Sequence, residues 1–69
     1  MLIRMVRGTL NLDQTMALIV SNGEIQAYPN SDGQYYISVQ IYGTNAEAQA
    51  EVDRITNAYA NGAAVYDMR

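Results

Sequence analysis

Residues Gln34 to Gly43 read QYYISVQIYG and carry the clearest secondary-structure signal in the chain. β-Branched and aromatic residues alternate here with a period of two, which is the pattern of a half-buried strand. The residues expected on its core face are Tyr35, Ile37, Val39 and Ile41. Tyr36 and Tyr42 then project from the opposite face. We expect the rest of the chain to pack around this strand.

The segment before this strand, residues 15–28, predicts a β-hairpin. Asn22-Gly23 is a dipeptide strongly preferred in two-residue type I′ turns. The register set by this turn pairs Val20 with Ile25 and Leu18 with Ala27. Apolar pairs of this kind stabilise antiparallel strands. The turn-forming run from Pro29 to Gly33 then predicts a second hairpin, which joins residues 24–28 to the strand in QYYISVQIYG.

Residues 13–22 have a second interpretation as a helix. Asp13 would cap its start and Gly23 would end it. The apolar stripe of that helix would be Leu12, Met16, Ile19 and Val20. The β-branched pair Ile19-Val20 and the Asn22-Gly23 turn favour the hairpin. The helical alternative stays open at this point.

The N-terminal residues predict another strand over Leu2–Arg7. Apolar side chains fall on both of its faces, so we expect it to be central or covered on both sides. Residues 9–14 do not decide between a continued extended run and a turn.

A helix is predicted over residues 45–60. Thr44 can cap its start, and Glu47 three residues later completes a capping box. The apolar stripe consists of Ala48, Val52, Ile55 and Tyr59. Asn61-Gly62 is a stop signal. Residues 63–67 then form a short last strand.

These elements predict a single small α+β domain over residues 1–69. Its mainly antiparallel sheet has four or five strands, with a hairpin meander over residues 15–42, and packs on one long helix at about residues 45–60. The short C-terminal strand returns to the sheet. If residues 13–22 are helical, the order becomes βαββαβ, a ferredoxin-like sandwich.

Composition excludes several function classes. The chain has no Cys and no His, so it lacks thiolate and imidazole metal ligands and the commonest general base. We expect no enzyme activity, no cofactor and no metal site. The net charge is −3, and the few basic residues, Arg4, Arg7, Arg54 and Arg69, are scattered. This disfavours direct binding to nucleic acid or to an anionic membrane.

No stretch approaches the roughly 20 apolar residues of a membrane span, and the N-terminal residues do not resemble a signal peptide. We therefore expect a cytoplasmic protein. A domain of this size buries only about 60% of the surface that its unfolded chain exposes, and no disulfide can stabilise it. A homo-oligomer is a further expectation.

The tyrosines suggest a protein-binding surface. The chain has six Tyr but no Phe and no Trp. Tyrosine is enriched at protein interfaces because its large ring is ordered at low entropic cost. Acidic side chains would add charge complementarity to a basic partner. The candidate binding residues are Tyr28, Tyr36, Tyr42, Glu24, Glu47, Glu51 and Asp53.

In size and charge the chain is similar to phage-encoded inhibitors of host defence, including anti-CRISPR proteins. That resemblance implies a protein partner with a basic, nucleic-acid-binding surface. Two other hypotheses remain, a ligand-sensing regulatory domain of ferredoxin-like type and a self-assembling structural subunit. In the latter, the chain would associate through the sheet or through the small residues Ala46 and Ala50.

Overall fold

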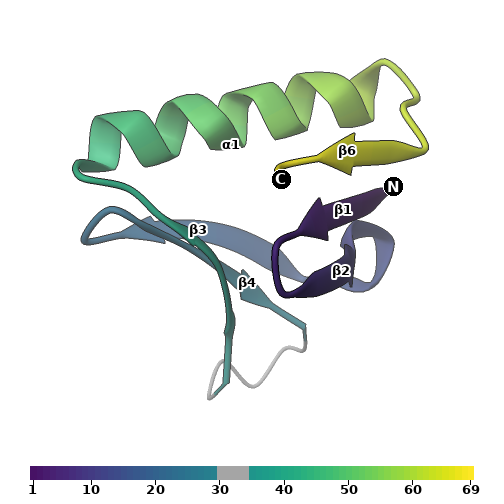
Figure 1. Cartoon of the computed structure of the whole chain (residues 1–69). Coiled ribbons are helices and arrows are strands. Elements are labelled where there is room, and N and C mark those ends of the chain that lie inside the picture. Colours follow the sequence, from purple (N-terminus) through teal and green to yellow (C-terminus); the bar gives the residue numbers. More distant parts are fainter. Residues whose placement is uncertain (30–34) are drawn as a thin grey trace.

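The computed structural model describes residues 1–29 and 35–69. Its elements are β1 Leu2–Met5, β2 Gly8–Asn11, the 3-10 turn η1 Leu12–Gln14, β3 Ala17–Ser21, β4 Glu24–Tyr28, β5 Ile37–Ile41, α1 Asn45–Ala60 and β6 Val65–Asp67. Figure 1 shows α1 lying across one side of two small sheets. This is the predicted α+β fold. Most of the predicted turn at residues 29–33 lies outside the described residues.

The first sheet, β3-β4-β5, is the predicted meander. Asn22 and Gly23 have φ angles of 52° and 78°, as a type I′ turn requires. Both predicted apolar pairs, Val20 with Ile25 and Leu18 with Ala27, are present. The helical alternative for residues 13–22 is therefore wrong. The βαββαβ order of a ferredoxin-like sandwich required that helix, so it is wrong too. Ile19 and Val20 in β3 are β-branched and favour a strand. The helical turn before this strand is η1, which ends at Gln14.

The second sheet, β2-β1-β6, holds the two ends of the chain together. β1 pairs antiparallel with β2 and parallel with β6, so it is central, as its two apolar faces predict. The expected strand over residues 2–7 ends earlier, at Met5, where the chain turns back into β2. The strands thus form two three-stranded sheets, where the sequence predicts one sheet of four or five strands. η1 separates β2 from β3, so the two sheets do not share a ladder.

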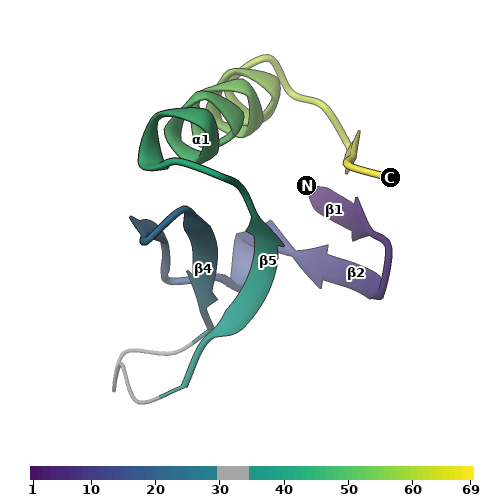
Figure 2. The same cartoon turned by 60° about the vertical axis from the view of Figure 1, so that its left-hand side comes forward.

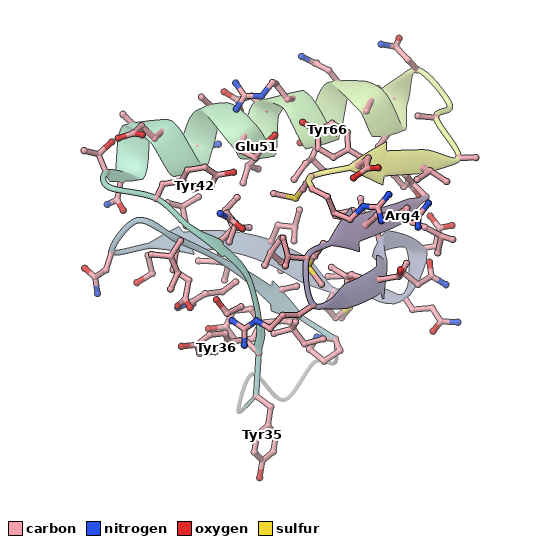
Figure 3. The ribbon with its side chains drawn as sticks, viewed as in Figure 1. Arg4, Tyr35, Tyr36, Tyr42, Glu51 and Tyr66 are labelled. Atoms are coloured by element: carbon pink, nitrogen blue, oxygen red, sulfur yellow. The ribbon has the colours of Figure 1, made fainter. Side chains whose placement is uncertain are left out.

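A bulge in the pairing of β4 with β5 overturns the predicted face assignment of β5. Ile25 pairs with Gln40, and the next residue of β4 pairs with Ser38, so Val39 is the extra residue. Val39 is buried, but Ile41 is 64% exposed. Tyr35, also expected in the core, is 71% exposed and points away from the body of the molecule (Figure 3). Figure 2 shows β5 at the edge of its sheet.

Helix α1 begins and ends where its sequence signals predict. The Thr44 hydroxyl oxygen accepts a hydrogen bond from the Glu47 backbone N–H at 3.2 Å and donates one to the Glu47 carboxylate at 3.2 Å. Gly62, with φ of 79°, ends the helix in the left-handed conformation. The predicted stripe is confirmed at Ala48 and Ile55, both fully buried. Tyr59, at its end, stays half exposed.

The core lies where α1 meets the two sheets. Among the described residues, the buried hydrophobic side chains are Ile3, Leu10, Ile25, Ala27, Val39, Ala48 and Ile55. The three largest that are fully buried, Ile3, Ile25 and Ile55, come from β1, β4 and α1. The helix therefore joins two sheets that have no strand pairing between them.

Candidate protein-binding surface

The face of β3-β4-β5 that carries the candidate tyrosines is defined by the strand register. We call the surface formed by Ile19, Glu24, Gln26, Tyr28, Tyr36, Ser38 and Ile41 the outer sheet face. Cross-strand pairs place Ile19 beside Gln26, Gln26 beside Ser38, and Glu24 beside Ile41. Figure 3 shows Tyr36 at the end of the molecule opposite α1.

Hydrogen bonds hold the polar side chains of the outer sheet face in a connected row. The Tyr28 hydroxyl donates to Gln26 Oε1 at 3.0 Å, and Gln26 Nε2 donates to Glu24 Oε1 at 2.8 Å. The rings of Tyr28 and Tyr36 lie with centroids 5.6 Å apart and planes tilted by 45°, an ordinary aromatic contact. Both rings are therefore positioned before any partner binds.

Glu24 carries the charge of this face. Hydrogen bonds from Ser38, then from Gln26, lower the pKa of the Glu24 carboxyl, which is therefore ionised at neutral pH. The same charge raises the pKa of Tyr36, whose hydroxyl stays protonated. Glu24 is the only charged residue in β3, β4 and β5. The exposed side chains of Ile19 and Ile41 extend the face with apolar area.

The structure does not place Tyr42 and Glu51 on this surface. The bulge at Val39 reverses the alternation, so Tyr42 turns toward α1 while Tyr36 does not. The Tyr42 hydroxyl donates to Glu51 Oε1 at 2.9 Å, and the Tyr66 hydroxyl donates to Glu51 Oε2 (Figure 3). Arg54 Nε donates to Glu51 Oε2 at 3.2 Å. We call these four residues the Glu51 cluster.

The Glu51 cluster joins three elements. Its residues come from α1, from β6 and from the segment after β5. Burial, followed by the hydrogen bond to Glu51, raises the pKa of Tyr42 to about 12. Burial alone would raise the pKa of Glu51, but the hydrogen bonds from Tyr66, Arg54 and Tyr42 outweigh it, so that pKa is lowered. Tyr42 and Glu51 therefore have a structural role, because their hydrogen bond links α1 to the segment after β5.

The remaining candidate residues lie on α1, away from the tyrosine pair. Glu47 belongs to the capping box, and Asp53 accepts a hydrogen bond from Gln49 Nε2 at 3.1 Å on the exposed side of the helix. The candidate set therefore separates into three places. Tyr28, Tyr36 and Glu24 come together on the outer sheet face, and Tyr42 and Glu51 come together in the Glu51 cluster.

Sequence reasoning missed Gln26, Ile19, Ser38 and Ile41. The turn at Asn22-Gly23 fixes Ile19 opposite Gln26, so that part of the face could have been found from the register. The alternation of QYYISVQIYG puts Ser38 on the same face as Tyr36, so Ser38 could also have been found. Ile41 could not, because the bulge that aligns it with Glu24 has no sequence signal such as a glycine in β5.

Comparisons of the chain with protein-family models, with curated proteins and with solved structures found no match. Within residues 1–29 and 35–69, no group of three acidic side chains lies close enough to hold a metal ion. Helix α1, the only α-helix in that part of the chain, is not long and apolar enough to cross a membrane.

Proposed function

We propose that this chain is a non-enzymatic protein-binding module that binds its partner through the outer sheet face. The observation that carries the proposal is the pair of rings of Tyr28 and Tyr36, held beside an ionised Glu24 by hydrogen bonds outside the core. A fixed aromatic pair loses little conformational entropy on binding. The two exposed isoleucines, Ile19 and Ile41, supply apolar area around it.

Charge supports a basic protein partner. The chain has a net charge of −3, and no Lys or Arg lies in the three strands of the outer sheet face; one arginine, Arg7 in the turn between β1 and β2, lines a pocket beside Ser38 and Ile41. Single-stranded nucleic acid also stacks on sheet tyrosines, but it needs basic groups to match its phosphates. The finer proposal, from the similarity in size and charge to phage inhibitors, is that this face covers a basic, nucleic-acid-binding surface of a host defence protein.

The test begins with the purified chain as bait. Bound proteins are eluted with salt, identified by mass spectrometry and then titrated individually against the chain. Tyr36→Ala should weaken binding of the identified partner by about 2 kcal/mol, roughly thirtyfold, as a central aromatic contact does. Tyr35→Ala is the matched control, because Tyr35 is the adjacent tyrosine, is not among the residues of the outer sheet face and points away from the body of the molecule.

Two outcomes would contradict the proposal. The first is an unchanged affinity for a folded Tyr36→Ala variant. The second is self-association that depends on Tyr36 and captures no other protein, which would make the face a homo-oligomer interface. Tyr42→Ala is unsuitable for this test, because Tyr42 holds the Glu51 cluster together.

A further inference from the structure

A groove on another side of the molecule has no role in the proposed protein interface. It lies between η1, β3 and the C-terminal half of α1, and its volume is about 530 Å³. This is within the range of about 300–1,000 Å³ typical of small-molecule sites. Its lining includes Leu18, Val52, Ile55, Thr15, Thr56 and Tyr59, together with Asp13 and Met16.

The floor of the groove is apolar. Ile55 is fully buried, and Leu18 and Val52 are half-buried beside it. Met16 also lines the groove and is 64% exposed. Its flexible thioether side chain can adapt to the shape of a ligand. The floor can therefore take an aliphatic or aromatic body.

The side-chain hydroxyls around the groove have all used their protons within the chain. The Thr15 hydroxyl donates to the Asn11 carbonyl at 3.1 Å, and the Thr56 hydroxyl donates to the Val52 carbonyl at 2.8 Å. The Tyr59 hydroxyl donates to Asp13 Oδ1 at 2.9 Å. A hydroxyl has one proton and two acceptor lone pairs, so each of these groups has only acceptor capacity left.

Two backbone N–H groups at the groove are also occupied. The Thr15 N–H donates to the Leu12 carbonyl at 3.0 Å, and the Met16 N–H donates to the Tyr28 carbonyl at 2.7 Å. Asp13 adds a carboxylate, which only accepts while it is ionised. A hydrogen bond from the N-terminal ammonium, followed by the bond from Tyr59, lowers the pKa of Asp13. No Lys or Arg lines the groove.

The N-terminal ammonium lies 2.9 Å from Asp13 Oδ2 and compensates part of the carboxylate charge. Selectivity must therefore come from the remaining acceptor lone pairs and from the Tyr59 ring, whose face attracts cations. A ligand head group that donates several hydrogen bonds and carries a positive charge satisfies both. The hydroxyls of Thr15, Thr56 and Tyr59 would offer a carboxylate head group no free proton.

We propose that this groove binds a small amphipathic amine. Its apolar body lies on Leu18, Val52 and Ile55, and its ammonium group donates to the hydroxyl oxygens of Thr15, Thr56 and Tyr59. This site is separate from the outer sheet face, and the inference does not depend on the proposed function.

Three probes with one apolar body test the proposal. They are 4-phenylbutylamine, 4-phenylbutanol and 4-phenylbutanoate, each titrated at neutral pH into the isotope-labelled chain while amide NMR shifts are followed. The amine should shift the amides of Leu18, Val52 and Tyr59 and should bind about tenfold more tightly than the alcohol, which is the worth of a charge-assisted hydrogen bond. The carboxylate should bind most weakly.

A matched pair of variants locates the site. Ala60→Leu fills the groove, because Ala60 lines it at the end of α1, and should weaken amine binding about tenfold. Ala50→Leu makes the same change on α1 outside the groove and should leave binding unchanged. The proposal is overturned if the amine shifts none of the lining amides, if the alcohol or carboxylate binds as tightly as the amine, or if Ala60→Leu has no effect.

Discussion

At the residue scale, the Glu51 side chain makes the contacts that join α1 to β6 and to the segment after β5. It accepts hydrogen bonds from Tyr42, Tyr66 and Arg54, and its side chain is only 13% exposed. From sequence alone Glu51 looks like one more solvated acid of α1, because its tyrosine partners are distant in the chain. The contact could be predicted only with the bulge in β5 and the position of β6 already known.

Glu51→Gln should lower the free energy of unfolding by about 1–3 kcal/mol, because one of the donors loses a charged acceptor and meets an amide N–H₂ group. Urea unfolding followed by circular dichroism measures this change. The control is Asp53→Asn on the exposed side of the same helix, which should change stability by no more than about 0.5 kcal/mol. Equal effects of the two variants would contradict the role of the Glu51 cluster.

The pKa of about 12 for Tyr42 predicts a loss of stability at alkaline pH. The ordinary pKa of tyrosine is 10.0, so the folded state holds this proton more tightly than the unfolded state does. The contribution is fully present below pH 10 and is lost as pH rises from about 10 to 12. Unfolding measured across this range should show a shallower loss in Tyr42→Phe than in the original chain; identical slopes would contradict the assignment.

At the scale of elements, the local signals of the sequence were reliable. The turn at Asn22-Gly23, the register of β3 with β4, and both ends of α1 are confirmed, because each depends on residues close together in the chain. The faces of β5 were assigned wrongly beyond Val39, because a bulge depends on how the strand fits its partner. Of the candidate residues, Tyr28, Tyr36 and Glu24 lie together on the outer sheet face, whereas Tyr42 turns toward α1.

Two glycines provide a matched test of the turn after β3. Gly23 and Gly62 both have positive φ angles, of 78° and 79°. A Cβ on Gly23 would lie 2.5 Å from the Tyr42 backbone oxygen, whereas a Cβ on Gly62 would have no heavy atom within 4 Å. Gly62→Ala should cost about 1–2 kcal/mol for the left-handed backbone alone.

Gly23→Ala should cost clearly more than Gly62→Ala, because the backbone of Tyr42 must also move. Chemical denaturation of both variants gives the comparison. If the two substitutions destabilise the chain equally, the close approach of the β3–β4 turn to the segment after β5 is not present in solution.

At the scale of the whole molecule, one helix joins two sheets over a small core. The sequence predicts the α+β class and the meander, but not the division into two sheets. That division depends on η1, which separates β2 from β3, and the second sheet is completed by the parallel pairing of β1 with β6, between residues at opposite ends of the chain, which no local pattern encodes. The β4 part of the outer sheet face is the opposite case, since polar Glu24, Gln26 and Tyr28 alternate with apolar Ile25 and Ala27 in the sequence.

Ile3→Ala and Ile55→Ala should each cost about 2–5 kcal/mol, because they remove fully buried side chains from two different layers of the core. A loss of this size is a large fraction of the total stability of a small domain. The control is Ile19→Ala on the outer sheet face, where the side chain is already 45% exposed and the cost should be under about 1 kcal/mol. Thermal unfolding ranks the three variants, and a cost for Ile19→Ala equal to the others would contradict the assigned core.

If a protein partner binds the outer sheet face, amide NMR of the labelled chain with the captured partner will locate the contact there. The largest shifts should fall on Gln26, Tyr36, Ser38 and Ile41, while the exposed side of α1 around Asp53 stays unchanged. Shifts confined to α1, with β4 and β5 unaffected, would contradict binding through the outer sheet face.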